Sequence, residues 1–263
     1  MTVTATQVKE LRDATGAGMM DCKRALEETD GDVEEARRLL RERGVASAAR
    51  RAGRETTEGR VLARAEDGRA AIVAVACESE PVSKNEEFLR FAEELLAAVD
   101  ADGAEAVERF EDERLDLAGR LGENLVVRGA ARLEAQDGEV VSAYVHRPAE
   151  KIGVAVRMSG SPELARLLAM HVSFANPRYV ARDEVPAEEV AAERAIFEKL
   201  PDVASKPEQV RSKIVDGMLG KRFFAENVLV DQPWIHDTSV TVGRALSEHG
   251  AEVREFVRYS VAG

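Results

Sequence analysis

The chain lacks the features of exported and membrane proteins. Only two of its 263 residues are cysteines, Cys22 and Cys77, and neither belongs to a C-x-x-C pattern. Isolated thiols of this kind are typical of a reducing compartment. The first residues include no basic segment followed by an apolar one, and no apolar run approaches the roughly 20 residues needed to cross a bilayer. We therefore expect a cytoplasmic protein that does not enter a membrane.

The motifs of nucleotide-binding proteins and hydrolases are also missing. The sequence has no G-x-x-x-x-G-K-[ST] loop, no G-x-G-x-x-G motif after a predicted strand and no G-x-S-x-G elbow. His146, His236 and His249 are scattered, without a cysteine or carboxylate at the spacing of metal ligands. We expect no enzymatic activity, no direct nucleotide binding, no cofactor and no metal site.

Basic residues are outnumbered: 37 lysines and arginines face 49 aspartates and glutamates, for a net charge of −12. The acidic residues are spread along the chain, so its field repels phosphate backbones and disfavours nucleic-acid binding. One basic run, with Arg50, Arg51 and Arg54, lies in residues 45–58, which have no strong apolar stripe. We interpret this segment as a partly helical linker with a solvated surface, and RNA contact is the alternative.

The residues that are present predict a soluble globular chain of one to three domains, since 44% are hydrophobic and 33% charged. Residues 1–44 predict three short helices. Thr4 and Gln7 have the spacing of a capping box at the first, and Asp32 can cap the third. Gly44 has the place of a left-handed residue that ends a helix.

Two later segments share one plan. Residues 60–96 and 140–180 each contain a pair of β-rich runs and then an amphipathic helix, which is consistent with an internal duplication. A turn at residues 66–69 joins the first pair of runs. The apolar residues of the two helices recur at helical spacing and are Phe88, Phe91, Leu95, Val99, Leu164, Leu167 and Leu168.

The last third of the chain predicts helices and a final strand. Residues 188–200 and 208–219 form helical patterns separated by a break at 201–207, as in an antiparallel helical hairpin. Residues 239–248 predict a helix, and 253–261 a strand.

As a whole, the sequence predicts an α+β fold. A three-helix module at 1–44 precedes a first subdomain at 59–139 and a second at 140–263, and each subdomain has a small antiparallel sheet with flanking helices. The second carries the helical hairpin at about 187–220.

One long segment resembles a known family. Residues 8–27 read VKELRDATGAGMMDCKRALE, and Asp-Gly-Asp follows at 30–32. This segment is similar to the amino-terminal, ubiquitin-associated-like module of elongation factor Ts. Further segments follow the order of the same family, so that the resemblance covers essentially the whole chain: Leu121–Asn124, Ile152–Val154, Met170–Val172, Asp183–Ala187, Lys213–Gly217 and Gln232–Pro233.

The resemblance implies both a fold and a function. The implied fold is a ubiquitin-associated-like module, two pseudo-repeated subdomains and a helical hairpin in the second. The implied function is guanine-nucleotide exchange during translation elongation, in which the protein binds the GTPase elongation factor Tu and promotes release of its GDP without bond chemistry. We therefore expect elongation factor Tu as the partner.

The resemblance also implies four residues that grip the partner. Met19 and Met20 have flexible, polarisable side chains that suit a protein surface, and matching family residues contact the GTPase domain. Lys23 follows one turn later and supports the same contact, while His171 matches a family residue that touches the partner. As alternatives, the methionines fill the core of a small module, Lys23 is a solvated lysine, and His171 is a hydrogen-bonded core residue.

The loop at residues 79–85 carries the implied exchange activity. Family members usually read Thr-Asp-Phe-Val-Ala-Lys-Asn here, and their Asp-Phe pair enters the partner near its Mg²⁺ and phosphate site, where the aromatic ring pushes helices apart. In this chain Glu80 keeps a carboxylate but Pro81 replaces the aromatic ring, which makes it a divergent member. The expected residues of this Mg²⁺-dislocation loop are Ser79, Glu80, Pro81, Val82, Lys84 and Asn85.

Pro81 leaves alternatives open. Proline buries less area than phenylalanine, and at roughly 25 cal/mol per Å² the lost contact is on the order of 1–2 kcal/mol, which corresponds to a change in exchange efficiency of about tenfold or more. The pair Glu80-Pro81 also suits a plain turn between a strand and a helix. A second hypothesis is a divergent paralogue that binds elongation factor Tu as a regulator or chaperone without efficient exchange. A third is a ubiquitin-type or RNA adaptor built on residues 1–44.

Overall fold

The computed structural model describes residues 3–262, with the side chains of residues 45 and 47–49 excepted. Residues 1, 2 and 263, at the ends of the first and last predicted domains, lie outside this range. The contacts divide the chain into two compact units. One consists of Met1–Leu62, Val73–Ala131 and Tyr259–Gly263, and the other of Ala63–Ile72 and Arg132–Arg258. Each unit therefore draws on segments that are distant in the sequence.

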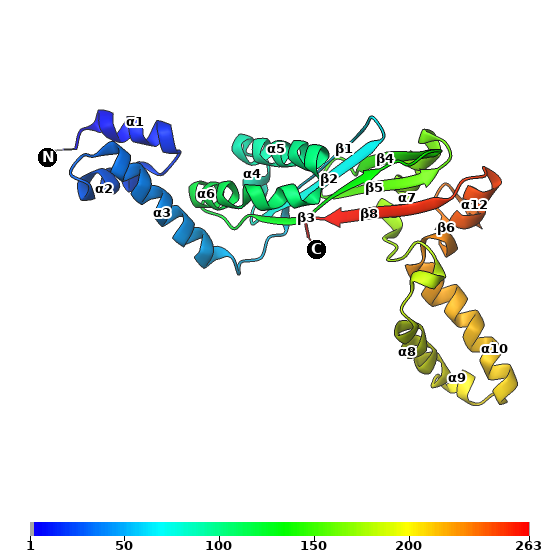
Figure 1. Cartoon of the computed structure of the whole chain (residues 1–263). Coiled ribbons are helices and arrows are strands. Elements are labelled where there is room, and N and C mark those ends of the chain that lie inside the picture. Colours follow the sequence, from blue (N-terminus) through cyan, green and yellow to red (C-terminus); the bar gives the residue numbers. More distant parts are fainter. Residues whose placement is uncertain (1–2, 263) are drawn as a thin grey trace. The chain divides into compact units, whose positions relative to one another are not determined.

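Three helices begin the first unit: α1 (Ala5–Thr15), α2 (Met19–Glu28) and α3 (Val33–Arg51) (Figure 1). The predicted capping box is confirmed, because the backbone N–H of Gln7 donates to the Thr4 hydroxyl and the Thr4 N–H donates to the Gln7 side chain. The predicted cap of α3 is also present, because the Asp32 carboxylate accepts the backbone N–H of Glu35 at 3.0 Å. Their small core consists of Val8, Leu11, Cys22, Ala25, Leu26 and Ala36.

The predicted end of the third helix at Gly44 is wrong. Helix α3 continues to Arg51, so the first half of the predicted linker is helical. The residues after Gly44 are alanines and arginines with one valine and one serine. Alanine and arginine are strong helix formers, and together they outweigh the roughly 1 kcal/mol that an interior glycine costs relative to alanine.

A three-stranded sheet follows, with the strand order β1-β2-β3. The strands are β1 (Glu58–Glu66), β2 (Arg69–Cys77) and β3 (Val126–Glu134). The predicted turn joins β1 to β2, since Asp67 and Gly68 have φ angles of 49° and 73° and both central residues are therefore left-handed. From Ala70 to Cys77 every residue of the central strand has no exposed area.

Helices connect β2 to β3: α4 (Glu80–Ser83), α5 (Glu86–Asp102), η1 (Ala104–Phe110) and α6 (Glu111–Leu121). The predicted apolar face of α5 is confirmed, because all four of its predicted residues are buried. An α-helix, α6, begins only at Glu111, and the residues before it form the 3-10 helix η1. There the ring of Phe110 meets that of Phe91 edge to face at 6.0 Å.

The second unit contains the sheet β4-β5-β8, formed by β4 (Glu139–Val145), β5 (Ile152–Ser159) and β8 (Val253–Ser260). Strands β4 and β5 are antiparallel, with Glu139 opposite Ser159 and Val145 opposite Gly153. Helix α7 (Pro162–Ala175) contacts both strands. Its inner face joins β5 and the later helix α12 (Val242–Glu248) in one apolar core.

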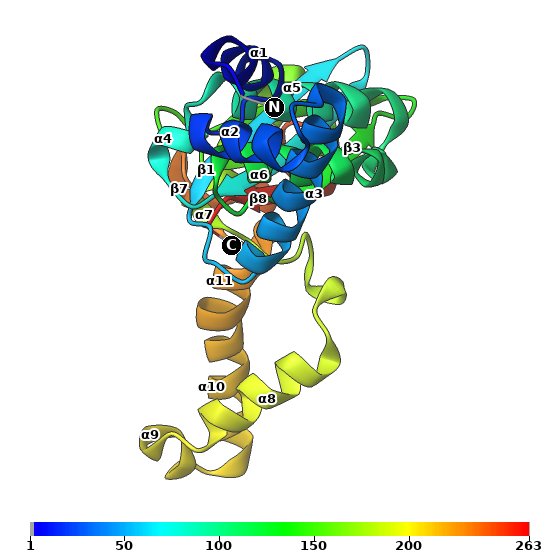
Figure 2. The same cartoon turned by 90° about the vertical axis from the view of Figure 1, so that its left-hand side faces the viewer.

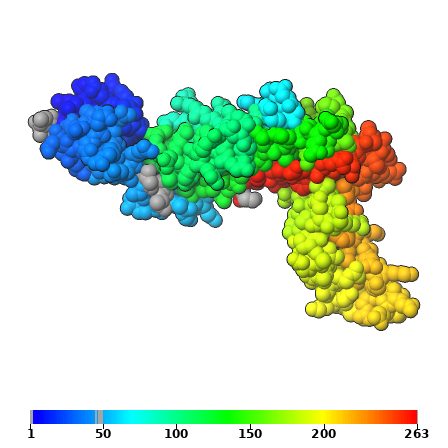
Figure 3. Space-filling view, viewed as in Figure 1, coloured from blue at the N-terminus to red at the C-terminus, as the bar shows by residue number. Residues whose placement is uncertain are grey.

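The predicted helical hairpin is present within the second unit. Figure 2 shows its two long helices, α8 (Ala187–Glu198) and α10 (Glu208–Met218), with the short helix α9 (Pro201–Ala204) at the tip. In Figure 3 the atoms of this segment, yellow to orange, pack as one continuous lobe. The hairpin has its own core of Phe197, Val203, Val215 and Leu219.

Short elements complete this unit: η2 (Arg182–Glu184), the π-helix η3 (Leu219–Phe224), α11 (Ala225–Asn227), η4 (Leu229–Asp231), β6 (Pro233–Trp234) and β7 (Asp237–Thr241). The prediction of a helix over 239–248 is wrong in its first three residues. These pair as β7 with β6, and helix α12 begins only where the Thr241 hydroxyl accepts the backbone N–H of Arg244 at 3.3 Å.

The predicted α+β class is confirmed, with helices beside small sheets in both units. In both three-stranded sheets a hairpin is followed in the chain by a helix, and the third strand pairs with the second strand of the hairpin. This shared plan agrees with the predicted pseudo-repeat. Among residues 3–262, no helix combines the length and the apolar character needed to cross a membrane.

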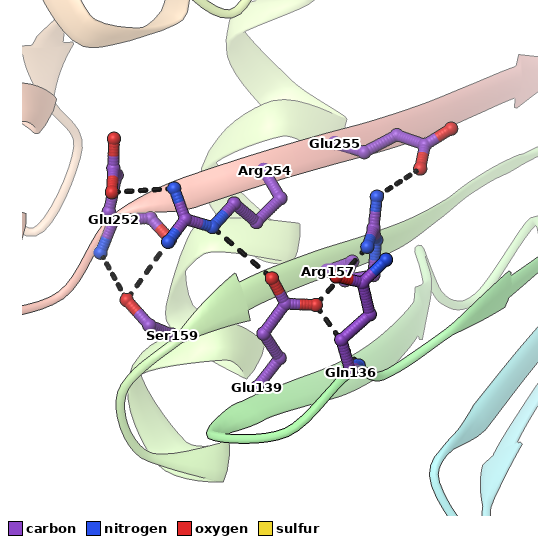
Figure 4. A network of polar contacts seen from close by, with 7 residues as sticks. All are labelled: Gln136, Glu139, Arg157, Ser159, Glu252, Arg254 and Glu255. Atoms are coloured by element: carbon purple, nitrogen blue, oxygen red, sulfur yellow. Dashed lines mark hydrogen bonds and ion pairs between the residues drawn. The ribbon is translucent and has the colours of Figure 1, made fainter.

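A polar network links the three strands of the second sheet (Figure 4). At its centre the Glu139 carboxylate accepts hydrogen bonds from Arg157, from Arg254 and from the backbone N–H of Gln136, at 3.2, 3.2 and 3.1 Å. The network continues to Ser159, Glu252 and Glu255. The hydrogen bond from Gln136 is the largest cause that holds the pKa of Glu139 below its usual range, and the arginines add to it.

We predict that Glu139→Gln destabilises the protein most at neutral pH. A carboxyl whose pKa is lowered by folding stabilises the folded state above its unfolded pKa, which is about 4.3 for glutamate, and loses that contribution as the pH falls through the lower, folded value. The difference in unfolding free energy between wild type and variant should therefore shrink below about pH 4.3. Urea unfolding between pH 7 and pH 3 measures it. A difference that stays constant over this range contradicts the assignment.

Candidate functional site

The start of α2 forms an exposed apolar shoulder. The side chains of Met19 and Met20 are 47% and 61% exposed, so neither fills the core of the module. Lys23 follows at a spacing that places it on the same side of the helix. Its ammonium lies 3.6 Å from the Glu27 carboxylate, and both side chains are about half exposed. The structure thus brings these three predicted residues together at the surface.

The loop before α2 explains this exposure. Gly16 is left-handed, with a φ of 68°, and ends α1. The Thr15 hydroxyl donates to the Leu11 carbonyl at 2.7 Å and accepts the backbone N–H of Ala17 at 3.3 Å. The chain therefore turns sharply, and α2 begins with its first two side chains outside the core.

The 79–85 loop is a compact turn between the buried strand β2 and helix α5, which is buried along one face. It contains α4, in which Pro81 occupies the first turn, where its fixed φ and missing N–H are well tolerated. Glu80, Pro81 and Lys84 are exposed, Val82 is partly buried and Ser83 is buried. The Lys84 ammonium lies 2.6 Å from the Glu80 carboxylate. Such an exposed pair contributes little stability, about 0–1 kcal/mol, so Glu80 can exchange this contact for another.

The end of this loop is fixed to the helix that follows. The Asn85 side chain accepts the backbone N–H groups of Glu87 and Phe88 at 2.8 and 3.4 Å and caps α5. In addition, the Arg60 guanidinium donates to the Ser83 carbonyl at 3.1 Å. Asn85 is therefore a structural cap within the loop.

The start of the loop is held by Glu123, a residue for which sequence analysis predicts no role. One of its carboxylate oxygens accepts the backbone N–H groups of Glu78 and Ser79, each at 3.0 Å, and the other accepts the Ser79 hydroxyl. Gly122, left-handed with a φ of 75°, ends α6 immediately before it. In the sequence, the feature that pointed to this turn was the match of residues 121–124 to the family, and that match implied no role for Glu123.

The neighbouring Asn124 extends this attachment. Its backbone N–H donates to the Glu78 carboxylate at 2.7 Å, and its buried side chain donates to the carbonyls of Ala52 and Arg54 at 3.3 and 3.0 Å. Glu78 in turn forms an ion pair with Arg54 at 3.4 Å. The loop's first residues, the turn at 123–124 and the chain that follows α3 are thus joined by hydrogen bonds.

His171 lies in the core of the second unit with no exposed area. Its Nδ1 accepts the backbone N–H of Ile235 at 3.3 Å, and its Nε2 lies 2.9 Å from the side-chain oxygen of Gln232. The Gln232 amide group donates to the carbonyls of Glu226 and Ala175. Because Nδ1 must accept, the proton belongs on Nε2, which donates to Gln232. The ring also stacks on Trp234 with centroids 5.2 Å apart.

This environment favours the neutral form of His171. Burial lowers its pKa, and the hydrogen bond with Gln232 opposes that shift only in part. Protonation would place a second donor against the N–H of Ile235. Folding therefore loses stability as the pH falls below about 6.5, where an unfolded histidine takes up a proton. In this structure His171 matches its alternative interpretation as a hydrogen-bonded core residue, and any contact with a partner requires a change in its surroundings.

A family model described as elongation factor TS matches residues 78–263. Three proteins named elongation factor Ts are 42%, 41% and 41% identical to the chain: those of Idiomarina loihiensis, Methylococcus capsulatus and Clavibacter michiganensis subsp. michiganensis. The alignments cover 99%, 99% and 98% of this chain and 91%, 92% and 98% of the relatives. The chain belongs to the elongation factor Ts family.

Membership in the elongation factor Ts family, a family of translation elongation factors, bears on the two surfaces differently. The match to the elongation factor TS model begins at Glu78, immediately before the 79–85 loop. The shoulder at Met19 and Met20 precedes that match and is covered by the alignments with the relatives, which span 99% and 98% of this chain. Among the described residues, no group of three or more histidine, cysteine, aspartate or glutamate side chains is placed to hold a metal ion.

We predict that His171→Ala lowers the free energy of unfolding by about 2–4 kcal/mol, because it leaves a cavity and the unpaired groups of Gln232 and Ile235. Phe174→Ala on the same helix is the control. Phe174 is 82% exposed, so its removal should change stability by less than about 0.5 kcal/mol. Urea unfolding at pH 7 compares the two variants, and equal stabilities would contradict the core role of His171.

Proposed function

We propose that this protein is a guanine-nucleotide exchange factor that binds elongation factor Tu in its GDP form and promotes GDP release during translation elongation in the cytoplasm. The observation that supports the proposal is the 79–85 loop. It is exposed at Glu80 and Pro81 and attached at both ends, and it belongs to a chain of the elongation factor Ts family.

The proposed mechanism is thermodynamic linkage without bond chemistry. A protein that binds the nucleotide-free GTPase more tightly than the GDP form must weaken GDP by the same factor. The loop would supply this difference in affinity by occupying space beside the Mg²⁺ and phosphates that the partner needs for GDP. A loop held at both ends suits this role, because a flexible one would yield to the partner instead of displacing its groups.

The shoulder on α2 would supply affinity that does not depend on the nucleotide. Methionine side chains adapt to a protein surface, and burying each contributes roughly 1.5–3 kcal/mol. Lys23 would add a charged contact in place of its ion pair with Glu27. In this proposal the shoulder holds the partner while the loop acts on its nucleotide site.

Pro81 favours a second candidate function. In the family the wedge is aromatic, whereas this exposed proline presents a smaller ring. A protein with this loop could bind elongation factor Tu as a regulator or chaperone and release GDP slowly. The two candidates differ in a single measurable quantity, the rate of GDP release at saturating factor.

We predict that the wild-type protein accelerates GDP release from elongation factor Tu, and that Pro81→Phe raises the saturated rate by about tenfold or more through the larger buried area. Stopped-flow measurement with a fluorescent GDP analogue gives both rates. Val82→Ala in the wild-type background is a control for loop changes that add no ring. Acceleration by the variant alone would favour the regulator or chaperone, and acceleration by neither would refute the exchange function.

We also predict that replacing both Met19 and Met20 by alanine weakens binding to elongation factor Tu by about tenfold or more, because two exposed apolar contacts are lost. The exposure of both side chains means that thermal stability should change little. Val33→Ala, an exposed apolar residue of the same module, serves as the control in calorimetric titration. Unchanged affinity in the double variant would remove the shoulder from the proposed interface.

A further inference from the structure

We propose that Glu123 is a positioning residue for nucleotide exchange: it fixes the start of the 79–85 loop so that Glu80 and Pro81 are presented in one orientation. The inference rests on the proposed function. It concerns a residue that lies 38 or more positions away in the sequence and is not part of the loop.

The geometry of the contact supports this role. Three donors converge on one carboxylate: the backbone N–H groups of Glu78 and Ser79 and the Ser79 hydroxyl. Backbone groups at the end of a strand can point in several directions once the strand pairing stops. A charged acceptor that binds two successive N–H groups removes that freedom more strongly than neutral acceptors do.

The contact also determines how the loop begins. Ser79 is the residue immediately before α4, and it has extended backbone angles with φ at −128° and ψ at 153°. Its own side chain makes no cap to the helix. The hydroxyl is instead committed to Glu123, so the direction in which α4 leaves the strand depends on a residue from the turn after α6.

Glu123 is itself held in place. It lies between Gly122, which ends α6, and the buried Asn124, which donates to Glu78 and to the chain after α3. The carboxylate is therefore attached to the rigid part of the unit on one side and to the loop on the other. Glu123 binds Ser79, the residue immediately before Glu80 and Pro81, and so acts on the exposed part of the loop through Ser79.

The test is a series of variants that remove different numbers of these contacts, measured for exchange activity and for local structure. Glu123→Ala removes all three contacts and Ser79→Ala removes one. Glu123→Gln keeps an oxygen for the two N–H groups and can donate from its amide to the Ser79 hydroxyl. Glu111→Ala is the matched control, because Glu111 lies on α6, the helix that precedes Glu123, but its carboxylate binds Arg114. Saturated GDP release from elongation factor Tu and amide hydrogen exchange at residues 78 and 79 are the measurements.

We expect Glu123→Ala to lower the saturated release rate by about tenfold, equivalent to about 1.4 kcal/mol, and to accelerate amide exchange at residues 78 and 79. The concentration of factor at half saturation should change little. Ser79→Ala and Glu123→Gln should fall between this variant and wild type, because each keeps part of the contact, while Glu111→Ala should stay near wild type. A merely structural role predicts a different pattern, in which loss of folded protein shifts the half-saturation concentration and leaves the plateau intact.

The outcomes separate this inference from the proposed function. A wild-type protein that does not accelerate GDP release refutes the exchange function, and the positioning role for exchange with it. An active wild type whose Glu123→Ala plateau is unchanged, or is restored at higher concentration, overturns only the role of Glu123. Should Glu123→Ala fail to fold, Ser79→Ala decides: an unchanged plateau overturns the inference, and a lowered plateau with normal half saturation supports it.

Discussion

The buried strand β2 is the constraint on which the 79–85 loop depends. All residues from Ala70 to Cys77 are inaccessible, so a shift of even one residue would require the whole strand to be repacked. Its end at Cys77 is therefore a fixed point. Helix α5 is fixed equally well by its buried aromatic and aliphatic face. The 79–85 loop joins β2 to α5, and the packing of these two elements fixes the positions of its ends.

This arrangement gives the two candidate surfaces different physical characters. Met19 and Met20 are flexible side chains on a small module with a thin core, suited to adapt to a partner. The 79–85 loop is short, capped by Asn85 and held by Glu123. Affinity gains from adaptable contacts, whereas displacement of a partner's groups requires a contact that does not yield. A factor that works by linkage needs both properties, and the chain places them in separate segments.

The sequence predicted most elements because their patterns are local. The capping box at Thr4 and the apolar face of α5 each follow from residues within a few turns of one another. The errors arose where distant or competing contacts decided. The helix-forming residues after Gly44 extend α3 to Arg51, and pairing with β6 places residues 239–241 in a strand. His171 shows the same limit, because a histidine on an apolar helix face can be covered by its own chain or by a partner, and its spacing does not say which.

By itself the sequence determined the fold class and the family, since these depend on periodicity, turn residues and a long matching segment. The exposure of Met19 and Met20 was decided by the tertiary structure, because the sequence also allowed them to fill the core of the module. Only the tertiary structure decided that Glu123 and Asn124 hold the start of the loop and that His171 is enclosed with both ring nitrogens bonded. Hydrogen bonds between residues more than 40 positions apart leave no periodic trace in a single sequence. They exist only once the strands and helices have brought the donors and acceptors together.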